Sequence, residues 1–131
     1  ASIALEKASG TAVPSNGRAT RNLILGANYL QSHILHFYHL AGQDFIQGPD
    51  TAPFMPRYAK PDLRLPPAIN AVGVDQYVEA LEVRAVCHEM VALFGGRMPH
   101  VHGILAGGAA EIPTKEKLVE VWGTALKPYL L

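Results

Sequence analysis

Apolar side chains recur every three or four residues across a long segment of the chain, residues 18–47. This spacing puts them on one face of a helix, because three to four residues make one helical turn. The members of this stripe are Leu23, Ala27, Leu30, Ile34, Phe37, Ala41 and Phe45. Other apolar residues lie outside the stripe, and no Asp, Glu, Lys or Arg occurs from Asn22 to Gln43. A helix that is apolar on nearly all sides is normally buried, so we predict a long buried helix over 18–47.

A membrane-spanning helix is the main alternative for this segment. Its polar side chains argue against that alternative, because polar groups are costly in lipid. They are Asn22, Asn28, Gln31, Ser32, His33, His36, His39 and Gln43. A straight helix over 18–47 would be about 45 Å long, whereas a compact domain of this size is roughly 36 Å across. We therefore expect the helix to kink at Gly26 or Gly42, or to belong to a larger protein body.

Shorter helices are predicted near both ends of the chain. Residues 1–9 have the pattern of the last turns of a helix, with Lys7 near the end and Gly10 where a C-terminal cap belongs. Thr114 can cap a last helix over 114–127, because its hydroxyl can accept a hydrogen bond from the first helical turn. The apolar side of that helix consists of Leu118, Val121, Trp122 and Leu126.

A further helix is predicted over 74–94, ended by two glycines. Its main apolar stripe consists of Ala80, Val83, Cys87, Met90 and Phe94. Its acidic residues gather on one side, which we expect to face solvent. These residues are Asp75, Glu79, Glu82 and Glu89. Another side of the helix carries Tyr77, Leu81, Arg84 and His88.

The segments between these helices are rich in proline or glycine. Residues 48–73 contain six prolines, and proline at this density is incompatible with a helix or a central strand. Residues 97–113 are rich in glycine, and their run LAGGAA follows no clear strand. We therefore predict an all-α fold in which long buried helices are joined by long Pro/Gly-rich connectors. The whole chain, 1–131, is expected to be one segment of a larger helical subunit.

Composition supports the expectation that much of the surface faces other protein. Hydrophobic residues make up 49% of the chain and charged residues only 17%, whereas an average soluble domain has roughly 25% charged residues. The formal net charge is zero, and no long basic run occurs, so electrostatics give no reason to expect nucleic acid as a partner. Cys87 is the single cysteine, which excludes an internal disulfide.

Three histidines, His33, His36 and His39, are spaced three residues apart and would lie on one side of the long helix. Three imidazoles on one side could bind zinc or relay protons. Alternatively, each could be a buried histidine that is hydrogen-bonded to its surroundings. Spacing alone favours this second interpretation, because none of the three makes the four-residue spacing that best pairs metal ligands on a helix.

Two other groups of polar residues could carry chemistry. Cys87 and His88 are adjacent, and adjacent helical side chains point about 100° apart, so Cys87 is interpreted as a core residue and not as a nucleophile. Arg84 and His88 share a face, and a buried arginine requires a partner, so this pair is expected to face a carboxylate or another subunit, or to be exposed. The string GGRMPHVHG contains His100 and His102. It is either an ordinary turn after a helix cap, or a fixed loop that directs a histidine toward a partner or cofactor.

Three strings of the sequence are distinctive: RNLILGANYLQSHILHFYHLAGQDF at 21–45, GPDTAPF at 48–54 and EALEVRAVCHEMVALFGGRMPHVHGILAGGAAEIPT at 79–114. They closely resemble the large subunit of nickel–iron hydrogenases, and HFYHL and FGGRMPH are the most specific parts. The residues in these strings are most similar to those of the selenium-containing branch of that family. The resemblance covers nearly the whole chain and implies a middle portion of the subunit.

This resemblance implies a mostly helical enzyme subunit that catalyses the reversible oxidation of H2 to protons and electrons. In the family, the cysteines of two sequence motifs coordinate a nickel–iron centre whose iron carries CO and cyanide. Neither motif occurs in this sequence. We expect the first motif just before Ala1 and the second well beyond Leu131. No residue of this chain, Cys87 included, is therefore expected to bind the metal, and the chain alone is expected to be inactive.

The resemblance also implies partners and site residues. The partners are the rest of the large subunit and a small subunit that carries iron–sulfur clusters, with H2 and protons as substrates. His100 matches a histidine that approaches the cluster nearest the active site. Ser32 and His33 match positions that line the active-site cavity, and some relatives have Asp at the position of Ser32, which puts a carboxylate proton relay there in doubt. His36 and Arg84 are expected to be buried supporting residues, and His88 is a further expected support.

Two other functions stay open from the sequence: a non-catalytic helical interaction or structural module, and a helical protein that binds zinc or haem through His33, His36 and His39. For a hydrogenase of anaerobic hydrogen metabolism, a periplasmic or membrane-associated site in a bacterium is expected, and the sequence leaves a cytoplasmic location open. No membrane-spanning segment is expected in this chain.

Overall fold

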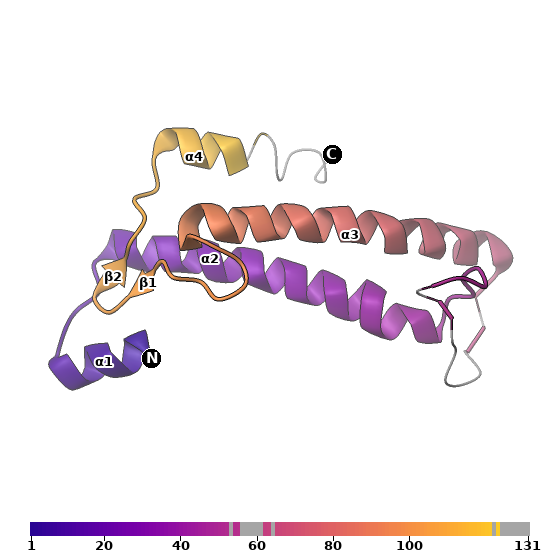
Figure 1. Cartoon of the computed structure of the whole chain (residues 1–131), viewed down its shortest axis with the longest axis horizontal. Helices are drawn as coiled ribbons and strands as arrows, with labels where there is room; N and C mark the ends of the chain where they lie inside the picture. Colours follow the sequence, from indigo (N-terminus) through magenta and orange to yellow (C-terminus); the bar gives the residue numbers. More distant parts are fainter. Residues whose placement is uncertain (53, 56–61, 64, 122, 124–131) are drawn as a thin grey trace. The chain divides into compact units, whose positions relative to one another are not determined.

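A computed structural model describes residues 1–52, 54–55, 62–63, 65–121 and 123, and this part of the chain is mostly helical (Figure 1). Helix α1 (Ser2–Ser9) ends as expected at Gly10, which has a φ of 67° and donates its backbone N–H to the carbonyl of Glu6. Glycine adopts this left-handed conformation without the steric cost that a side chain would impose.

The long helical segment changes its geometry along its length. Regular α-helix α2 (Ser15–Ile34) is followed directly by a π-helical segment η1 (Leu35–Ala41) and a short 3-10 turn η2 (Gly42–Asp44). Gly26 lies within regular α2, so the expected change of geometry does not occur there. The change begins at Leu35, and Gly42 starts the final tighter turn.

Helix α3 (Pro67–Gly95) begins seven residues earlier than the sequence suggested. The expectation that residues 48–73 contain no helix is therefore wrong from Pro67 onward. Proline is compatible with the first turn of a helix, because the N–H that it lacks would have no partner there. The predicted solvent side of this helix is confirmed, since all four of its acidic residues are exposed.

The predominantly helical fold agrees with the prediction, but the Gly-rich segment adds a small antiparallel hairpin that the sequence analysis did not predict. Strand β1 (Ile104–Leu105) pairs with β2 (Gly108–Ala109), with Ile104 opposite Ala109 and Leu105 opposite Gly108. The two strands are joined through Gly107, whose φ is 88°. A glycine with positive φ allows a tight reversal of the chain, and this turn was not recognised in the run LAGGAA.

The last described helix is α4 (Lys115–Glu120). Thr114 caps it as predicted, because its Oγ1 accepts a hydrogen bond from the backbone N–H of Lys117 at 3.4 Å. Val121 is buried, but Leu118 is exposed. Trp122, Leu126 and the rest of the predicted extension to residue 127 lie outside the described residues, apart from Gly123.

The chain divides into two compact units, residues 1–30 with 85–131, and residues 31–84. The first unit has a core of Ile24, Ala27, Val91, Phe94 and Val121. Apart from Ala27, the apolar stripe predicted for the long helix is not in that core, and Leu23, Leu30, Phe37 and Phe45 are exposed. When a helix is apolar on nearly all sides, its sequence does not indicate which face packs against other residues of the same chain. No helix among the described residues is long and apolar enough to cross a membrane.

Candidate functional site

Within residues 31–84, the π-helical segment contacts α3 through an aromatic cluster around Tyr77. His39 Nε2 lies 3.1 Å from the backbone carbonyl of Tyr77, and because a carbonyl can only accept, Nε2 carries the proton. The two rings meet edge to face, with centroids 4.7 Å apart. Gln43 Nε2 donates to Tyr77 Oη at 3.0 Å, and Phe54 packs against the Tyr77 ring. These contacts hold His39 in one orientation.

The π-helical geometry of this segment is visible in its hydrogen bonding. The backbone N–H of Gly42 bonds to the carbonyl of Phe37, five residues earlier. A Cβ at Gly42 would come within 3.1 Å of that same carbonyl oxygen, so glycine suits this close approach. π-Helical turns are rare and frequently occur at functional sites. The sequence spacing gave no sign of this turn, because the apolar pattern continues through it.

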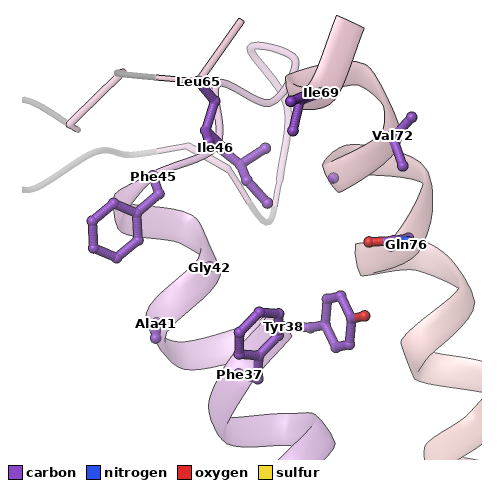
Figure 2. Close-up of a pocket in the computed structure, with 11 residues that line it drawn as sticks. Phe37, Tyr38, Ala41, Gly42, Phe45, Ile46, Leu65, Ile69, Val72 and Gln76 are labelled. Carbon is purple, nitrogen blue, oxygen red and sulfur yellow. The ribbon is translucent and has the colours of Figure 1, made fainter.

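An apolar cavity of about 350 Å³ lies beside this segment. Phe37 and Tyr38 reach it from η1, and Ile69, Val72 and Gln76 reach it from α3 (Figure 2). Its other lining residues are Ala41, Gly42, Phe45, Ile46, Leu65 and Gly73. None of these described lining residues carries a formal charge at neutral pH, so the cavity suits a small apolar molecule or an apolar side chain.

The three spaced histidines do not form a metal site. His33 and His36 are exposed, whereas His39 is half-buried against Tyr77. Among the residues that the structure describes, no three His, Cys, Asp or Glu side chains come together to hold a metal ion. In the π-helical turn, hydrogen bonds span five residues, so a three-residue spacing no longer keeps histidines on one side. A zinc site built from all three histidines therefore has no support in the described part of the chain.

The candidate cavity-lining and supporting residues have different surroundings. Ser32 and His33 are exposed near the end of α2. His36 was expected as a buried support, but its side chain is exposed on η1. Arg84 and His88 are half-buried on α3. His88 and His100 belong to the compact unit of residues 1–30 with 85–131, whereas Ser32, His33, His36 and Arg84 belong to residues 31–84.

Arg84 lies on the side of α3 that the sequence indicated, at the border between buried and exposed residues. Leu81 was expected beside it and is 47% exposed, whereas Tyr77 is buried. The buried face of α3 includes Ala80 and Cys87, and Arg84 lies between them in the helical repeat. The Nε of Arg84 is buried and has no hydrogen-bond partner in the described structure.

Glu6 and Arg21 form a buried ion pair that sequence reasoning missed. Arg21 donates through both of its Nη atoms to the Glu6 carboxylate, and through Nε to the carbonyl of Gly108 at 2.8 Å. It also donates to the carbonyl of Leu105, while the Gly107 N–H donates to Glu6 at 2.9 Å. The pair thereby ties α1 and α2 to the hairpin. The available signal was that Glu6 is the only acidic residue before Asp44.

Electrostatics support this arrangement. The hydrogen bonds from Arg21, and then that from the Gly107 amide, hold the pKa of the Glu6 carboxyl below its ordinary value. The same pairing raises the pKa of Arg21. Both residues therefore stay charged in the folded protein at neutral pH.

His100 lies in an exposed loop after α3, next to a cis peptide bond between Met98 and Pro99. Its φ is +62°, which is uncommon for a residue other than glycine. Its carbonyl accepts a hydrogen bond from Arg97 Nε at 2.9 Å, and the next loop histidine, His102, donates its backbone N–H to Gly95. This loop is therefore a defined, hydrogen-bonded structure that presents His100 at the surface.

Cys87 is buried in α3, and burial raises the pKa of its thiol. A thiol that stays protonated is a poor nucleophile and a poor metal ligand. The interpretation of Cys87 as a core residue is therefore confirmed by its surroundings.

Comparison with known proteins identifies the class of protein. The family model for nickel-dependent hydrogenases matches residues 1–51 and 43–124. The chain therefore belongs to the nickel-dependent hydrogenase family.

Relatives in the family have the same mainly helical structure over most of this chain. The chain is 58% identical over 126 residues to the periplasmic NiFeSe hydrogenase large subunit of Desulfomicrobium baculatum, covering 90% of this chain and 24% of that protein. It superposes on the solved NiFeSe hydrogenase of Desulfovibrio vulgaris Hildenborough with a TM-score of 0.83 and 74% identity, covering 87% of this chain and 24% of that one. Hydrogenase-2 large chain of Escherichia coli K12 is 27% identical over 150 residues. This chain spans about a quarter of the length of these relatives.

Proposed function

We propose that this chain is the middle helical portion of the large subunit of a nickel–iron hydrogenase of the selenium-containing branch. The complete subunit, joined to its partner, would catalyse the reversible oxidation of H2 to protons and electrons. The 58% identity to a NiFeSe hydrogenase large subunit over 90% of this chain is the observation that carries the proposal.

The chain contributes the surroundings of the metal centre and not its ligands. The described residues contain no group of three His, Cys, Asp or Glu side chains that fits a metal ion, and Cys87 is buried and protonated. The residues present therefore do not fit the nickel–iron centre with its CO and cyanide ligands. In this proposal, that centre is held by other parts of the subunit, and iron–sulfur clusters are held by the small subunit.

Exposed apolar side chains support the proposed partners, which are the rest of the large subunit and the small subunit. Phe37 is 66% exposed, Leu40 58% and Ile112 76%. Leaving such large apolar groups in water forgoes about 1.5–3 kcal/mol for each side chain that could be buried. An assembly that covers them would recover this free energy. A periplasmic location fits the proposal, because that is the compartment given for the D. baculatum relative.

The proposed function is tested with the complete enzyme, purified through a tag on the polypeptide that contains this sequence. We expect H2-dependent reduction of a viologen dye together with nickel and iron in the purified protein. Purified protein that assembles with its partner but contains no nickel and reduces no dye under H2 would support a non-catalytic structural module instead.

Replacing His100 is expected to change electron transfer more than metal content. In the proposal, the exposed imidazole lies near the iron–sulfur cluster closest to the active site, where donation of an N–H to a cluster sulfide would raise the cluster potential. We expect His100→Ala to lower that potential, measured by a redox titration followed by electron paramagnetic resonance, while nickel content stays at the wild-type level.

Two further variants separate this effect from backbone strain. His100→Asn keeps a residue that tolerates the positive φ observed here, and it should show the same change of potential. His102→Ala, in the same loop, should leave the potential unchanged. An unchanged potential in both His100 variants would remove the case for this role.

A further inference from the structure

One arginine interrupts the buried face of α3. The residues of this face are spaced alternately three and four positions apart, as is typical of a helix face that packs against other helices. It consists of Tyr77, Ala80, Arg84, Cys87, Val91 and Phe94. All of them are buried except Arg84, which is half-buried. Arg84 therefore occupies a position at which the same helix otherwise has apolar core residues.

Arg84 has no anionic neighbour on its own helix. A helical side chain reaches residues three and four positions away, and for Arg84 these are Ala80, Leu81, Cys87 and His88. None of these four is acidic. The acidic residues of α3 lie on its exposed side, and those nearest in sequence are Glu79, Glu82 and Glu89. The helix itself therefore cannot neutralise the guanidinium.

The buried part of the guanidinium also lacks a hydrogen bond. The Nε atom is fully shielded from solvent and has no partner among the described residues. Burying an ionised group without compensation is costly, and buried arginines are normally paired with an anion. The guanidinium always remains charged, so it cannot escape the cost by losing a proton.

We propose that Arg84 is an internal binding site for a carboxylate that belongs to another part of the hydrogenase large subunit. The inference rests on the proposed function, since the relatives of this chain are about four times as long. A carboxylate matches the planar guanidinium with two parallel hydrogen bonds and also cancels its charge, whereas a neutral carbonyl would leave the charge uncompensated. Arg84 thereby anchors α3 to the subunit core as a positioning residue.

The test uses the complete enzyme and measures thermal unfolding, which does not require turnover. Arg84→Ala is expected to lower the melting temperature by several degrees and the yield of assembled enzyme several-fold. Guanidinium at about 10 mM, too little to act as a denaturant, is expected to restore at least half of the lost melting temperature. The same concentration of urea, which has a similar shape without the charge, is expected to restore none of it.

Two matched variants give the controls. Arg18→Ala removes an exposed cation from α2 and should change the melting temperature little, with no response to guanidinium. Arg84→Met keeps the apolar stem of the side chain and removes its charge, and it should remain less stable than wild type. If Arg84→Ala does not accumulate at all, Arg84→Met decides the matter by its melting temperature.

Several results would overturn the proposal. They are wild-type stability of Arg84→Ala or Arg84→Met, equal rescue of Arg84→Ala by guanidinium and urea, and no rescue by either. Failure of the proposed function would be seen separately, as a purified protein that contains no nickel and oxidises no H2. The thermal-rescue measurement does not depend on either property.

Discussion

Purified without the rest of the enzyme, the 131-residue chain is expected to aggregate, to contain no nickel and to oxidise no H2. Aggregation follows from the apolar surface of the long helical segment, where Leu25, Tyr29, Leu30, Phe37 and Leu40 are each more than 40% exposed. Exposed apolar patches of this kind mark interaction surfaces, and without their partners they drive self-association. We expect no nickel because the sequence has a single cysteine, the buried Cys87, and lacks the two cysteine motifs that hold the metal in the family.

Size-exclusion chromatography with light scattering measures the aggregation, and elemental analysis measures nickel. A fusion of the chain to a soluble carrier protein provides the control, because it separates failure to bind nickel from insolubility. The expected result is a soluble fusion with no bound nickel after incubation with the metal. Monodisperse chain that melts cooperatively, or one nickel per chain in the fusion, would contradict the account.

Disruption of the Glu6–Arg21 pair is expected to lower the stability of the protein far more than removal of an exposed charge. Arg21→Met would remove the donors to Glu6, Leu105 and Gly108 and leave the buried Glu6 carboxylate with the Gly107 amide. Removing one partner of a buried pair is far more costly than removing a surface charge. In the complete enzyme, the melting temperature of Arg21→Met should fall well below that of Arg18→Met. The latter is the control, because it removes an exposed arginine one turn earlier on α2.

The same pair should make stability depend on pH. Because the folded-state pKa of Glu6 is lowered, its contribution is fully present above the pKa of an unfolded glutamate, about 4.3, and is lost as the pH falls through the folded-state value. Glu6→Gln should therefore lower the melting temperature at pH 7, and its difference from wild type should shrink at acidic pH. The measurement is a series of thermal scans across pH. A difference that stays constant down to the most acidic pH would show that the ionised carboxylate is not the stabilising group.

Local features of the fold could be predicted from the sequence where one residue decides the geometry. Gly10 ends α1 because the C-terminal cap requires a left-handed backbone conformation, which glycine adopts easily. Thr114 caps α4 through its own hydroxyl. The exposed acidic side of α3 and the buried position of Cys87 followed equally from helical spacing. Each of these features depends on neighbours within one or two helical turns.

Other features depend on contacts between distant segments, and the sequence pattern did not reveal them. The π-helical turn at Leu35–Ala41 continues the apolar pattern of α2 and is held against α3 by His39 and Tyr77. The Glu6–Arg21 pair joins residues fifteen positions apart and also holds the hairpin. The covered face of α2 could not be deduced, because nearly every side of that helix is apolar.

The candidate site residues were named from family resemblance, and they are distributed over both compact units. Ser32, His33 and His36 are exposed in one unit, and His100 is exposed in the other. Their proposed roles require atoms supplied by other parts of the enzyme, which explains why spacing within this chain could not define a complete site. Arg84 differs from them, because its buried and unpaired Nε is visible within this chain and is the observation from which we propose a carboxylate partner.

Hydrogen–deuterium exchange of the complete enzyme tests most directly whether the long apolar helix lies inside a larger hydrogenase assembly. Backbone amides over residues 23–45 are the relevant probe, since this segment contains exposed side chains such as Leu30, Phe37 and Leu40. We expect these amides to be among the slowest in the enzyme to exchange, because surrounding protein would cover the helix. Exchange at the rate of a free surface helix would contradict the account.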